Sequence, residues 1–193
     1  MTRLIAFEGG EACGKSTQAA LLASRLGAVL TREPGGTAVG ERVRAVLLDR
    51  SVAGLDARAE ALLMAAARAQ HVAEVVRPAL AAGRDVVTDR FSHSSLAYQG
   101  FGRGLPVDEV RRLSEWATGG LWPDVVVLLD LPAGEADARR GRPDRFEAEG
   151  AEFHRRVEAG FRALAAADPA RWRVVDGTGT IDEVAARVWE AVG

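Results

Sequence analysis

The residues that most clearly point to chemistry form a glycine-rich stretch near the start of the chain. Residues 9–16 read GGEACGKS, which fits the spacing G-x-x-x-x-G-K-S/T of a phosphate-binding loop. In such a loop, successive backbone N–H groups point inward around a phosphate, and Gly9 and Gly14 permit the turn and the close approach. We expect Lys15 to reach the β- and γ-phosphates of a nucleotide and the Ser16 hydroxyl to hold Mg²⁺. The predicted nucleotide-binding residues are Gly9, Gly10, Glu11, Ala12, Cys13, Gly14, Lys15, Ser16 and Thr17.

Lys15 is the only lysine of the chain, which contains 24 arginines. In a chain this strongly biased toward arginine, an ordinary surface lysine would have become arginine. The retention of Lys15 therefore indicates that its position requires a lysine. The alternative interpretation of residues 9–16 is a chance glycine-rich turn between a strand and a helix. The flanking patterns and the single lysine both favour the phosphate-binding loop.

The elements that must position this loop alternate along the chain. Five short apolar runs predict strands at residues 3–8, 28–31, 85–88, 124–131 and 172–176. Helical spacing is found at residues 15–26, 37–48, 56–82, 107–118, 151–167 and 180–192, and a further helix is expected to begin near residue 133. Pro78 is expected to kink or restart the longest of these helices. The alternation predicts a three-layer α/β fold, a five-stranded parallel sheet with helices on both faces.

Length and composition bound the class of protein. A chain of 193 residues with 48% hydrophobic and 27% charged residues suits one globular domain, residues 1–193. Its single cysteine, Cys13, excludes an intrachain disulfide framework, and we expect cytoplasmic residence. No apolar run approaches the roughly 20 residues of a membrane span, and the first residues contain no long apolar signal core. The net charge of −2 gives no reason to expect a nucleic acid or membrane partner.

Further motifs follow the second and third predicted strands, where ligands bind in open parallel sheets. Residues 31–37 read TREPGGT, residues 89–100 read DRFSHSSLAYQG, and residues 143–147 read PDRFE. Together with FEGGEACGKST at residues 7–17, this series resembles the bacterial thymidylate kinases over nearly the whole chain. The resemblance implies a P-loop kinase fold and transfer of the γ-phosphoryl group of ATP to dTMP, giving dTDP and ADP in dTTP synthesis. It also implies Mg²⁺ as cofactor and a homodimer, for which the Ala-rich helix could supply the contact.

The resemblance assigns the acceptor phosphate to three arginines, and the guanidinium fork suits a dianionic phosphate. They are Arg32, Arg44 and Arg90; Arg44 could instead form a surface ion pair. Asp89 is expected to serve Mg²⁺ through water, or alternatively to orient Arg90. Glu33 resembles the family residue near the sugar and the acceptor phosphate, and Glu11 the acid beside the acceptor nucleotide. Glu11 need not be a general base, because the nucleophile is already an anionic phosphate oxygen.

Polar residues matching those of the family are expected at the thymine base. Arg68, Ser95 and Gln99 each carry a group that can donate or accept a hydrogen bond at the edge of a pyrimidine, and the Gln99 amide can do both. Tyr98 is expected near the deoxyribose, where a wall disfavours a 2′-hydroxyl. Ser95 could alternatively cap a helix N-terminus.

The sequence departs from the family pattern at two positions. Met64 stands where the family usually has an aromatic residue on thymine; a thioether can pack on a ring face, and an ordinary core methionine is the alternative. Ala12 stands where the family commonly has glycine, so a positive φ there would strain it.

A short Arg-rich lid is predicted at about residues 139–150. Since the variable loop residues Glu11, Ala12 and Cys13 include no arginine, positive charge over the phosphates must come from elsewhere. A lid arginine could act like an arginine finger; the alternative is a solvated charged turn. The predicted catalytic residues are Lys15, Arg90, Arg139, Arg140, Arg142 and Arg145.

Two other functions are compatible with the nucleotide-binding motif. One is a nucleoside or nucleotide kinase of similar architecture with a different base choice. The other is a nucleotide-binding module or regulatory protein that has lost turnover. Retention of Lys15, Arg90 and the Arg-rich segment argues against such a loss.

Overall fold

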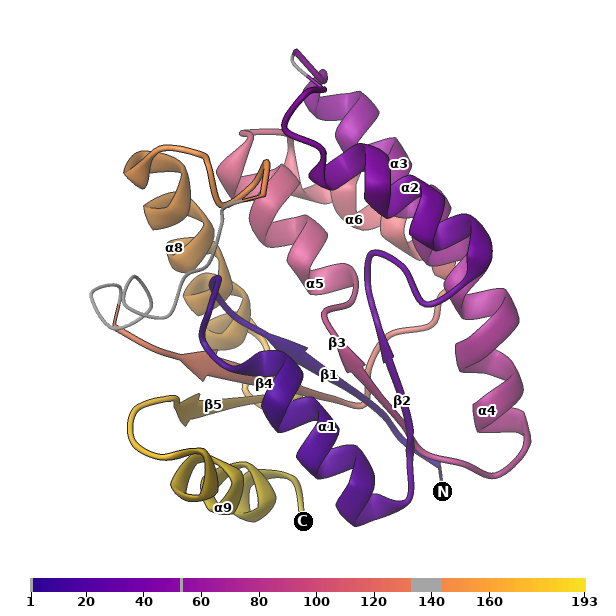
Figure 1. Ribbon diagram of the computed structural model, residues 1–193, viewed down its shortest axis with the longest axis vertical. Helices are drawn as coiled ribbons and strands as arrows, with labels where there is room; N and C mark the ends of the chain where they lie inside the picture. Colours follow the sequence, from indigo (N-terminus) through magenta and orange to yellow (C-terminus); the bar gives the residue numbers. More distant parts are fainter. Residues whose placement is uncertain (1, 53, 133–143) are drawn as a thin grey trace.

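The computed structural model describes residues 2–52, 54–132 and 144–193. Its centre is a sheet in which every neighbouring pair of strands is parallel, in the order β2-β3-β1-β4-β5 (Figure 1). The strands are β1 (Leu4–Glu8), β2 (Val29–Arg32), β3 (Val86–Asp89), β4 (Val125–Asp130) and β5 (Trp172–Asp176). The predicted five-stranded parallel sheet is therefore confirmed.

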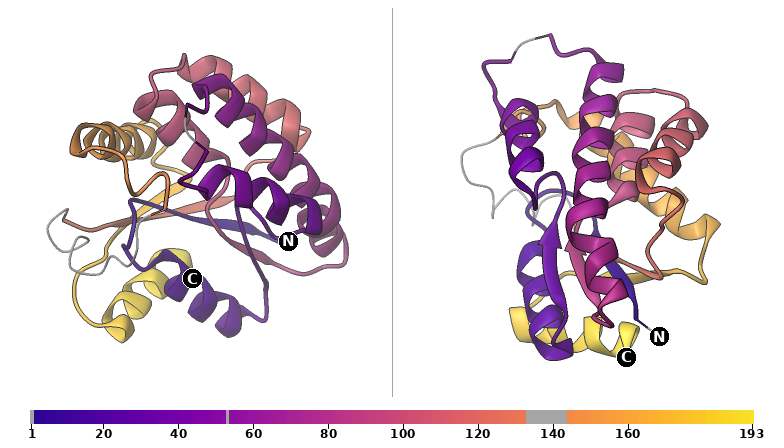
Figure 2. Two further views of the ribbon diagram at one scale, coloured as in Figure 1. Left: turned by 45° about the horizontal axis from the view of Figure 1, so that its top comes forward. Right: turned by 90° about the vertical axis from the view of Figure 1, so that its right-hand side faces the viewer.

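Helices cover both faces of this sheet (Figures 1 and 2), as predicted. They are α1 (Lys15–Leu26), α2 (Ala38–Leu48), α3 (Ala57–His71), η1 (Val72–Val76), α4 (Arg77–Ala81), α5 (Ser92–Ser95), η2 (Leu96–Gly102), α6 (Val107–Thr118), α8 (Ala151–Ala167) and α9 (Ile181–Val192). Thr37 and Thr180 cap α2 and α9 with their side chains, so these helices begin one residue after the predicted starts. Among the described residues, no helix is long and apolar enough to cross a membrane.

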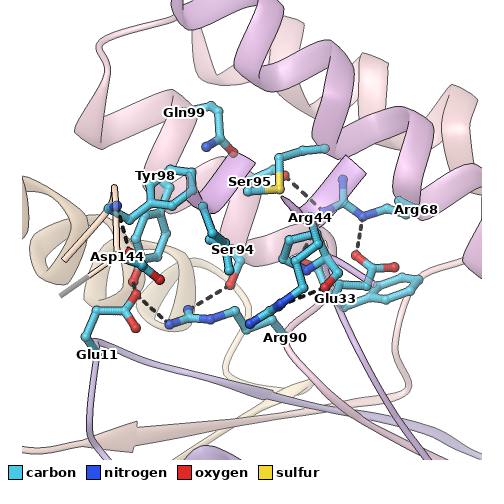
Figure 3. A pocket seen from close by; sticks show the side chains of 15 residues that line it. Glu11, Glu33, Arg44, Arg68, Arg90, Ser94, Ser95, Tyr98, Gln99 and Asp144 are labelled. Carbon is cyan, nitrogen blue, oxygen red and sulfur yellow. Dashed lines mark hydrogen bonds and ion pairs between the residues drawn. The ribbon is translucent and has the colours of Figure 1, made fainter. Parts of the chain in front are cut away.

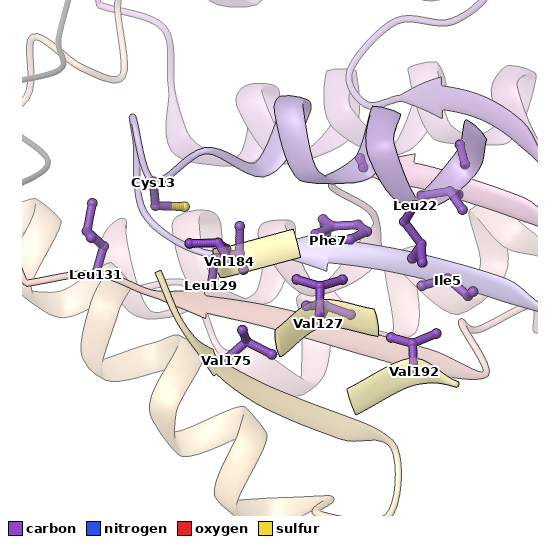
Figure 4. Close-up of a cluster of buried hydrophobic side chains, with 14 residues drawn as sticks. Ile5, Phe7, Cys13, Leu22, Val127, Leu129, Leu131, Val175, Val184 and Val192 are labelled. Carbon is purple, nitrogen blue, oxygen red and sulfur yellow. The ribbon is translucent and has the colours of Figure 1, made fainter. Parts of the chain in front are cut away.

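The strands divide their side chains between two apolar layers because successive residues point to opposite faces. Ile5 and Phe7 of β1 pack with α1 and α9 in one cluster, shown in Figure 4. Leu4 and Ala6 of the same strand pack on the other face with η1 and Phe91. Both faces of β1 are fully buried, which explains why this strand is apolar without alternation.

Two helical segments differ from the sequence-based expectation. The predicted helix 56–82 changes to a π-helical turn at η1 and restarts at α4, next to Pro78, whose missing N–H and ring disrupt regular α-helical bonding. The second segment, α5 with η2, was not predicted as a helix. Its residues Leu96 to Gly100 are all buried, so the segment carries no amphipathic period for a sequence reading to detect. The helix expected near residue 133 lies outside the described residues.

Candidate active site

The glycine-rich loop leaves the carboxyl end of β1 and enters α1, the context that its motif requires. Gly9 has φ +142°, and a Cβ there would lie 2.7 Å from the Leu129 carbonyl oxygen, so the close packing excludes a side chain. Gly14 caps α1 with φ +91°. Ala12 has φ +55°, so the predicted strain at this residue is present, at a cost of about 1 kcal/mol.

Lys15 is buried and folds back over its own loop. Its Nζ donates a hydrogen bond to the Gly10 carbonyl oxygen and lies 3.4 Å from the Cys13 sulfur. The Cys13 thiol donates to the same carbonyl at 3.2 Å, which makes it a small packed residue of the loop. The ammonium group is thus held within the loop, at the cavity where a polyphosphate would lie.

Ser16, in the first turn of α1, meets Asp89 at the end of β3. The Ser16 hydroxyl donates to Asp89 Oδ2, and Asp89 Oδ1 is buried with no hydrogen-bond partner among the described residues. Within the described ranges, no hydrogen bond or ion pair joins the Asp89 side chain to Arg90, so the alternative orienting role would have to act through the charge of Asp89, which favours the ionised arginine. Hydroxyl and carboxylate oxygens are hard ligands of the kind that Mg²⁺ prefers, so this pair fits the cation.

Arg90 is the centre of a partly buried charge cluster. Its guanidinium donates to Glu11 Oε1 at 2.7 Å, to the Gly9 carbonyl at 3.1 Å and to the Ser94 hydroxyl at 3.2 Å. The Tyr98 hydroxyl also donates to Glu11 Oε1. Burial opposes the ionisation of Glu11, but the charges of Arg90 and Lys15 outweigh it and lower the Glu11 pKa to about 2. Glu11 is therefore an anion that anchors Arg90 at neutral pH.

Glu8, which the sequence analysis missed, stabilises this cluster through Phe91 and Ser94. Its carboxylate accepts the backbone N–H groups of Phe91 and Ser94 at 3.0 and 3.1 Å and the Ser94 hydroxyl at 2.5 Å. Since Ser94 in turn accepts from Arg90, Glu8 fixes the start of α5 and the arginine together. Desolvation by burial raises the Glu8 pKa to about 7, against the opposing effects of Ser94 and Arg90. A charged residue closing an otherwise apolar strand was the available signal.

Two other predicted arginines line the same cavity from β2 and α2. Arg32 pairs with Glu41 at 2.8 Å in an exposed position, and Arg44 donates to the Pro34 carbonyl at 2.8 Å. Partial burial and the nearby charge of Arg32 lower the Arg44 pKa, which means that the two cations repel each other. An anion between them would relieve that repulsion. The surface ion pair considered for Arg44 is instead formed by Arg32.

Glu33 and Arg68 form a buried pair rather than two free ligand contacts. Arg68 Nε donates to Glu33 Oε2 at 2.8 Å, and the second Glu33 oxygen lies 2.9 Å from His71 Nδ1. Arg68 also donates to the Ser95 hydroxyl at 3.0 Å. Ser95 lies inside the continuous helix of α5 and η2 and makes no capping bond, so the alternative role as a helix cap is wrong.

Two adjoining cavities organise these groups. We name the first the apolar pocket (Figure 3); it is lined by Glu11, Glu33, Pro34, Arg44, Leu48, Met64, Arg68, Arg90, Phe91, Ser94, Ser95, Tyr98, Gln99, Asp144 and Phe146. The second, the P-loop cavity, is lined by Glu11, Ala12, Gly14, Lys15, Ser16, Thr17, Arg32, Glu33, Arg44, Asp89, Arg90, Asp144 and Glu147. Glu11, Glu33, Arg44, Arg90 and Asp144 belong to both. The structure thus brings the predicted substrate residues together in the apolar pocket, except Arg32, which lines the P-loop cavity alone.

The wall of the apolar pocket includes aromatic residues that the sequence analysis did not single out. Phe91 and Phe146 line it beside Tyr98, whose ring lies edge-on to Phe146 at 5.7 Å between centroids. Met64 lines the same pocket and also packs against the neighbouring core, so packing of its thioether on a thymine ring stays a prediction. Phe146 belongs to the PDRFE motif, which was the available signal.

Only one of the four predicted lid arginines lies within the described residues. Arg139, Arg140 and Arg142 lie outside them. Arg145 Nη1 pairs with the buried Glu60 carboxylate at 2.8 Å, and its Nε donates to the Leu47 carbonyl at 2.6 Å. Arg145 is therefore directed toward α2 and α3, and it does not line the P-loop cavity.

Comparison with known proteins finds matches over nearly the whole chain. A family model described as Thymidylate kinase matches residues 7–188. The thymidylate kinase of Solidesulfovibrio magneticus is 50% identical over 204 residues, covering 98% of this chain and 98% of its own. That of Synechococcus sp. (strain JA-3-3Ab) is 52% identical, covering 97% of this chain and 94% of its own. The crystal structure of thymidylate kinase from Ehrlichia chaffeensis has a TM-score of 0.84 at 31% identity, covering 100% of this chain and 99% of that one.

Proposed function

Since the chain belongs to the thymidylate kinase family, we propose that its two adjoining cavities divide the reaction between them. The reaction transfers the γ-phosphoryl group of ATP to dTMP and gives dTDP and ADP. The P-loop cavity takes the ATP phosphates, and the apolar pocket takes dTMP. The observation that supports this assignment is the wall that the two cavities share, where donor and acceptor phosphates would meet; it consists of Glu11, Glu33, Arg44, Arg90 and Asp144.

The two arginines of the shared wall, Arg44 and Arg90, hold the acceptor phosphate beside the donor. Arg90 presents its guanidinium from a fixed position between Glu11 and Ser94, and Arg32 lines the P-loop cavity as a further cation. Lys15 exchanges the Gly10 carbonyl for the β- and γ-phosphates when ATP enters. Glu11, with a pKa of about 2, does not take up a proton at neutral pH, and the anionic acceptor oxygen needs no general base.

Ser16 and Asp89 are the residues that would hold Mg²⁺, which supplies positive charge to the ATP phosphates when bound. The buried, unpartnered Asp89 Oδ1 supports this role, within the part of the chain that the structure describes. Across the same residues, no three His, Cys, Asp or Glu side chains gather into a metal site of their own. The protein side chains would therefore supply few of the ligands of Mg²⁺, and phosphate oxygens and water would supply the others.

The inner end of the apolar pocket suits the edge of a thymine ring. Arg68 offers only donors, Ser95 offers a hydroxyl, and Gln99 offers an amide. Met64 and Phe146 supply apolar surface for the ring faces, and Tyr98 lies beside Glu11 where the deoxyribose joins the phosphate.

The acceptor panel is the experiment that tests the proposed function. With ATP and Mg²⁺, kcat/KM should be highest for dTMP and about fourfold lower for dUMP, because burying the C5 methyl group contributes about 0.8 kcal/mol. Coupled ADP release with dTMP, dUMP, dCMP, dGMP and dAMP measures this order. Faster use of a purine monophosphate would indicate a kinase of different base choice. Absence of ADP release with every acceptor would indicate a binding module without turnover.

The Arg-rich segment should contribute to kcat more than to dTMP binding, because its charge is needed when the phosphoryl group moves. Arg139, Arg140, Arg142 and Arg145 are each changed to Ala. At least one variant should lower kcat by about 10²-fold, on the arginine-finger scale reduced for neighbouring charges. The dTMP dissociation constant should move less than about tenfold. Steady-state kinetics and dTMP titration measure the two effects separately.

Arg145→Ala has a second expected consequence that distinguishes it from the other three variants. It removes an ionic partner of buried Glu60, so its melting temperature should fall as well. Near-normal kcat in all four variants would contradict the catalytic role of this segment.

Homodimer formation and cytoplasmic residence are also part of the proposal. Exposed apolar side chains on α2 and α3, among them Val39, Val46 and Leu62, offer a surface that a second copy could cover. Sedimentation of the wild type and of Leu62→Glu would test the dimer, with the variant expected to shift toward monomer.

A further inference from the structure

Glu60 is a completely buried acid on α3, outside the residues assigned to the reaction. Three side chains from later segments of the chain converge on its carboxylate. Gln99 Nε2 donates to Oε1 at 2.8 Å, Arg103 Nη2 pairs with Oε2 at 3.0 Å, and Arg145 Nη1 pairs with Oε2 at 2.8 Å. Arg103 and Arg145 form ordinary ion pairs with Glu60. Gln99 differs from them because it also lines the apolar pocket.

A carboxylate paired with two arginines can only accept hydrogen bonds. The Gln99 amide must therefore turn its NH₂ group toward Glu60, which leaves Oε1 on the opposite side. Gln99 is fully buried, and among the described residues its Oε1 has no hydrogen-bond partner. Figure 3 shows the Gln99 amide at the end of the pocket away from Glu11 and Arg90. The pocket thus carries a free acceptor of fixed orientation where the base is expected.

The orientation of this amide matters because pyrimidines differ in their hydrogen-bonding edge. Thymine and uracil present a ring N–H donor beside a carbonyl acceptor, whereas cytosine presents a ring nitrogen acceptor beside an amino donor. Arg68, which offers only donors, suits the carbonyl, and Gln99 Oε1 suits the N–H. With the amide reversed, Gln99 would present a donor to the ring nitrogen of cytosine.

We propose that Glu60 is a positioning residue that sets base choice: it holds the Gln99 amide with its oxygen toward the base, so that thymine or uracil is matched and cytosine is not. Glu60 itself does not touch the substrate. The proposal rests on the assignment of the apolar pocket to dTMP.

Glu60→Gln tests the proposal, because the isosteric amide can donate or accept and so permits Gln99 to turn. We measure kcat/KM and the dissociation constant for dTMP and dCMP in the wild type and the variant. The dTMP-to-dCMP ratio should fall about tenfold or more, the scale of one hydrogen bond to a buried group. A folded variant whose ratio stays within twofold of the wild type would overturn the proposal.

Arg103→Met is the matched control, since it removes an ion pair of Glu60 but leaves the bond from Gln99. It should lower the melting temperature and retain the wild-type ratio. If Arg103→Met lowered the dTMP-to-dCMP ratio as much as Glu60→Gln does, the change in base choice would follow from the lost charge balance around Glu60. That result would contradict the proposal.

Glu60→Asp keeps the charge for the arginines and shortens the reach to Gln99, so it covers the case in which Glu60→Gln does not fold. The dTMP-to-dCMP ratio of Glu60→Asp should lie clearly below the wild-type ratio. An unchanged ratio in the folded variant would contradict the proposal. Failure of the wild type to phosphorylate dTMP is a separate result, which would remove the proposed function itself.

Discussion

Lys15→Ala should lower phosphoryl transfer to dTMP by about 10³-fold or more while the fold stays intact, because the loop lysine acts on charge that develops on the transferring phosphates. Among the residues that the structure describes, the Lys15 ammonium group contacts only its own loop, at the Gly10 carbonyl and the Cys13 sulfur. These contacts do not tie separate elements together. Coupled ADP release at saturating ATP and dTMP measures the loss, and circular dichroism and thermal unfolding check the fold.

A matched control for this variant lies on the same helix. Arg25→Ala removes a cation at the last turn of α1, where the guanidinium lies over Trp189 at 3.6 Å and far from the loop. It should keep kcat near the wild-type value and affect only thermal stability. A properly folded Lys15→Ala variant with activity within tenfold of the wild type would contradict the phosphate-binding role of residues 9–16.

Arg90→Ala should lower kcat/KM for dTMP by about 10³-fold, since truncating one member of a buried charge pair costs on the order of 4 kcal/mol. The variant removes the proposed contact with the acceptor phosphate and leaves the partly buried Glu11 without its main counter-charge. The Glu11 pKa should therefore rise above its present value of about 2. Steady-state kinetics and dTMP titration measure the functional effect.

Two further variants identify what Arg90 contributes. Arg90→Lys restores the charge but not the fork that reaches Glu11, Gly9 and Ser94 together, so recovery should be partial. Arg42→Ala removes an exposed arginine on α2 and should leave kcat/KM within about twofold, as expected for surface positions. If Arg90→Ala bound dTMP as tightly as the wild type, the acceptor phosphate would have to lie elsewhere.

Most elements of the fold could be predicted from the sequence because their signals are local. A strand that is buried on both faces appears in the sequence as a short run of apolar residues. An amphipathic helix appears as apolar residues that recur about every 3.6 positions. The bounds of α1, α6 and α8 are those predicted from that repeat. The helical segment Ser92–Gly102 was not predicted, because nearly all of its residues are buried. Apolar and polar residues therefore do not alternate along it with a helical period.

The sequence by itself predicted the phosphate-binding loop, because its motif follows a strand and so lies at the carboxyl end of the sheet, and the resemblance to a family predicted the residues around the acceptor. Only the tertiary structure decided their partners. Glu60 meets Gln99 39 residues away, Glu8 meets Ser94 86 residues away, and Arg145 meets the Leu47 carbonyl 98 residues away. Such contacts depend on strand order and on how helices pack across a face, and neither is encoded in local spacing. The orientation of Gln99 and the fixed position of Arg90 follow from these distant contacts.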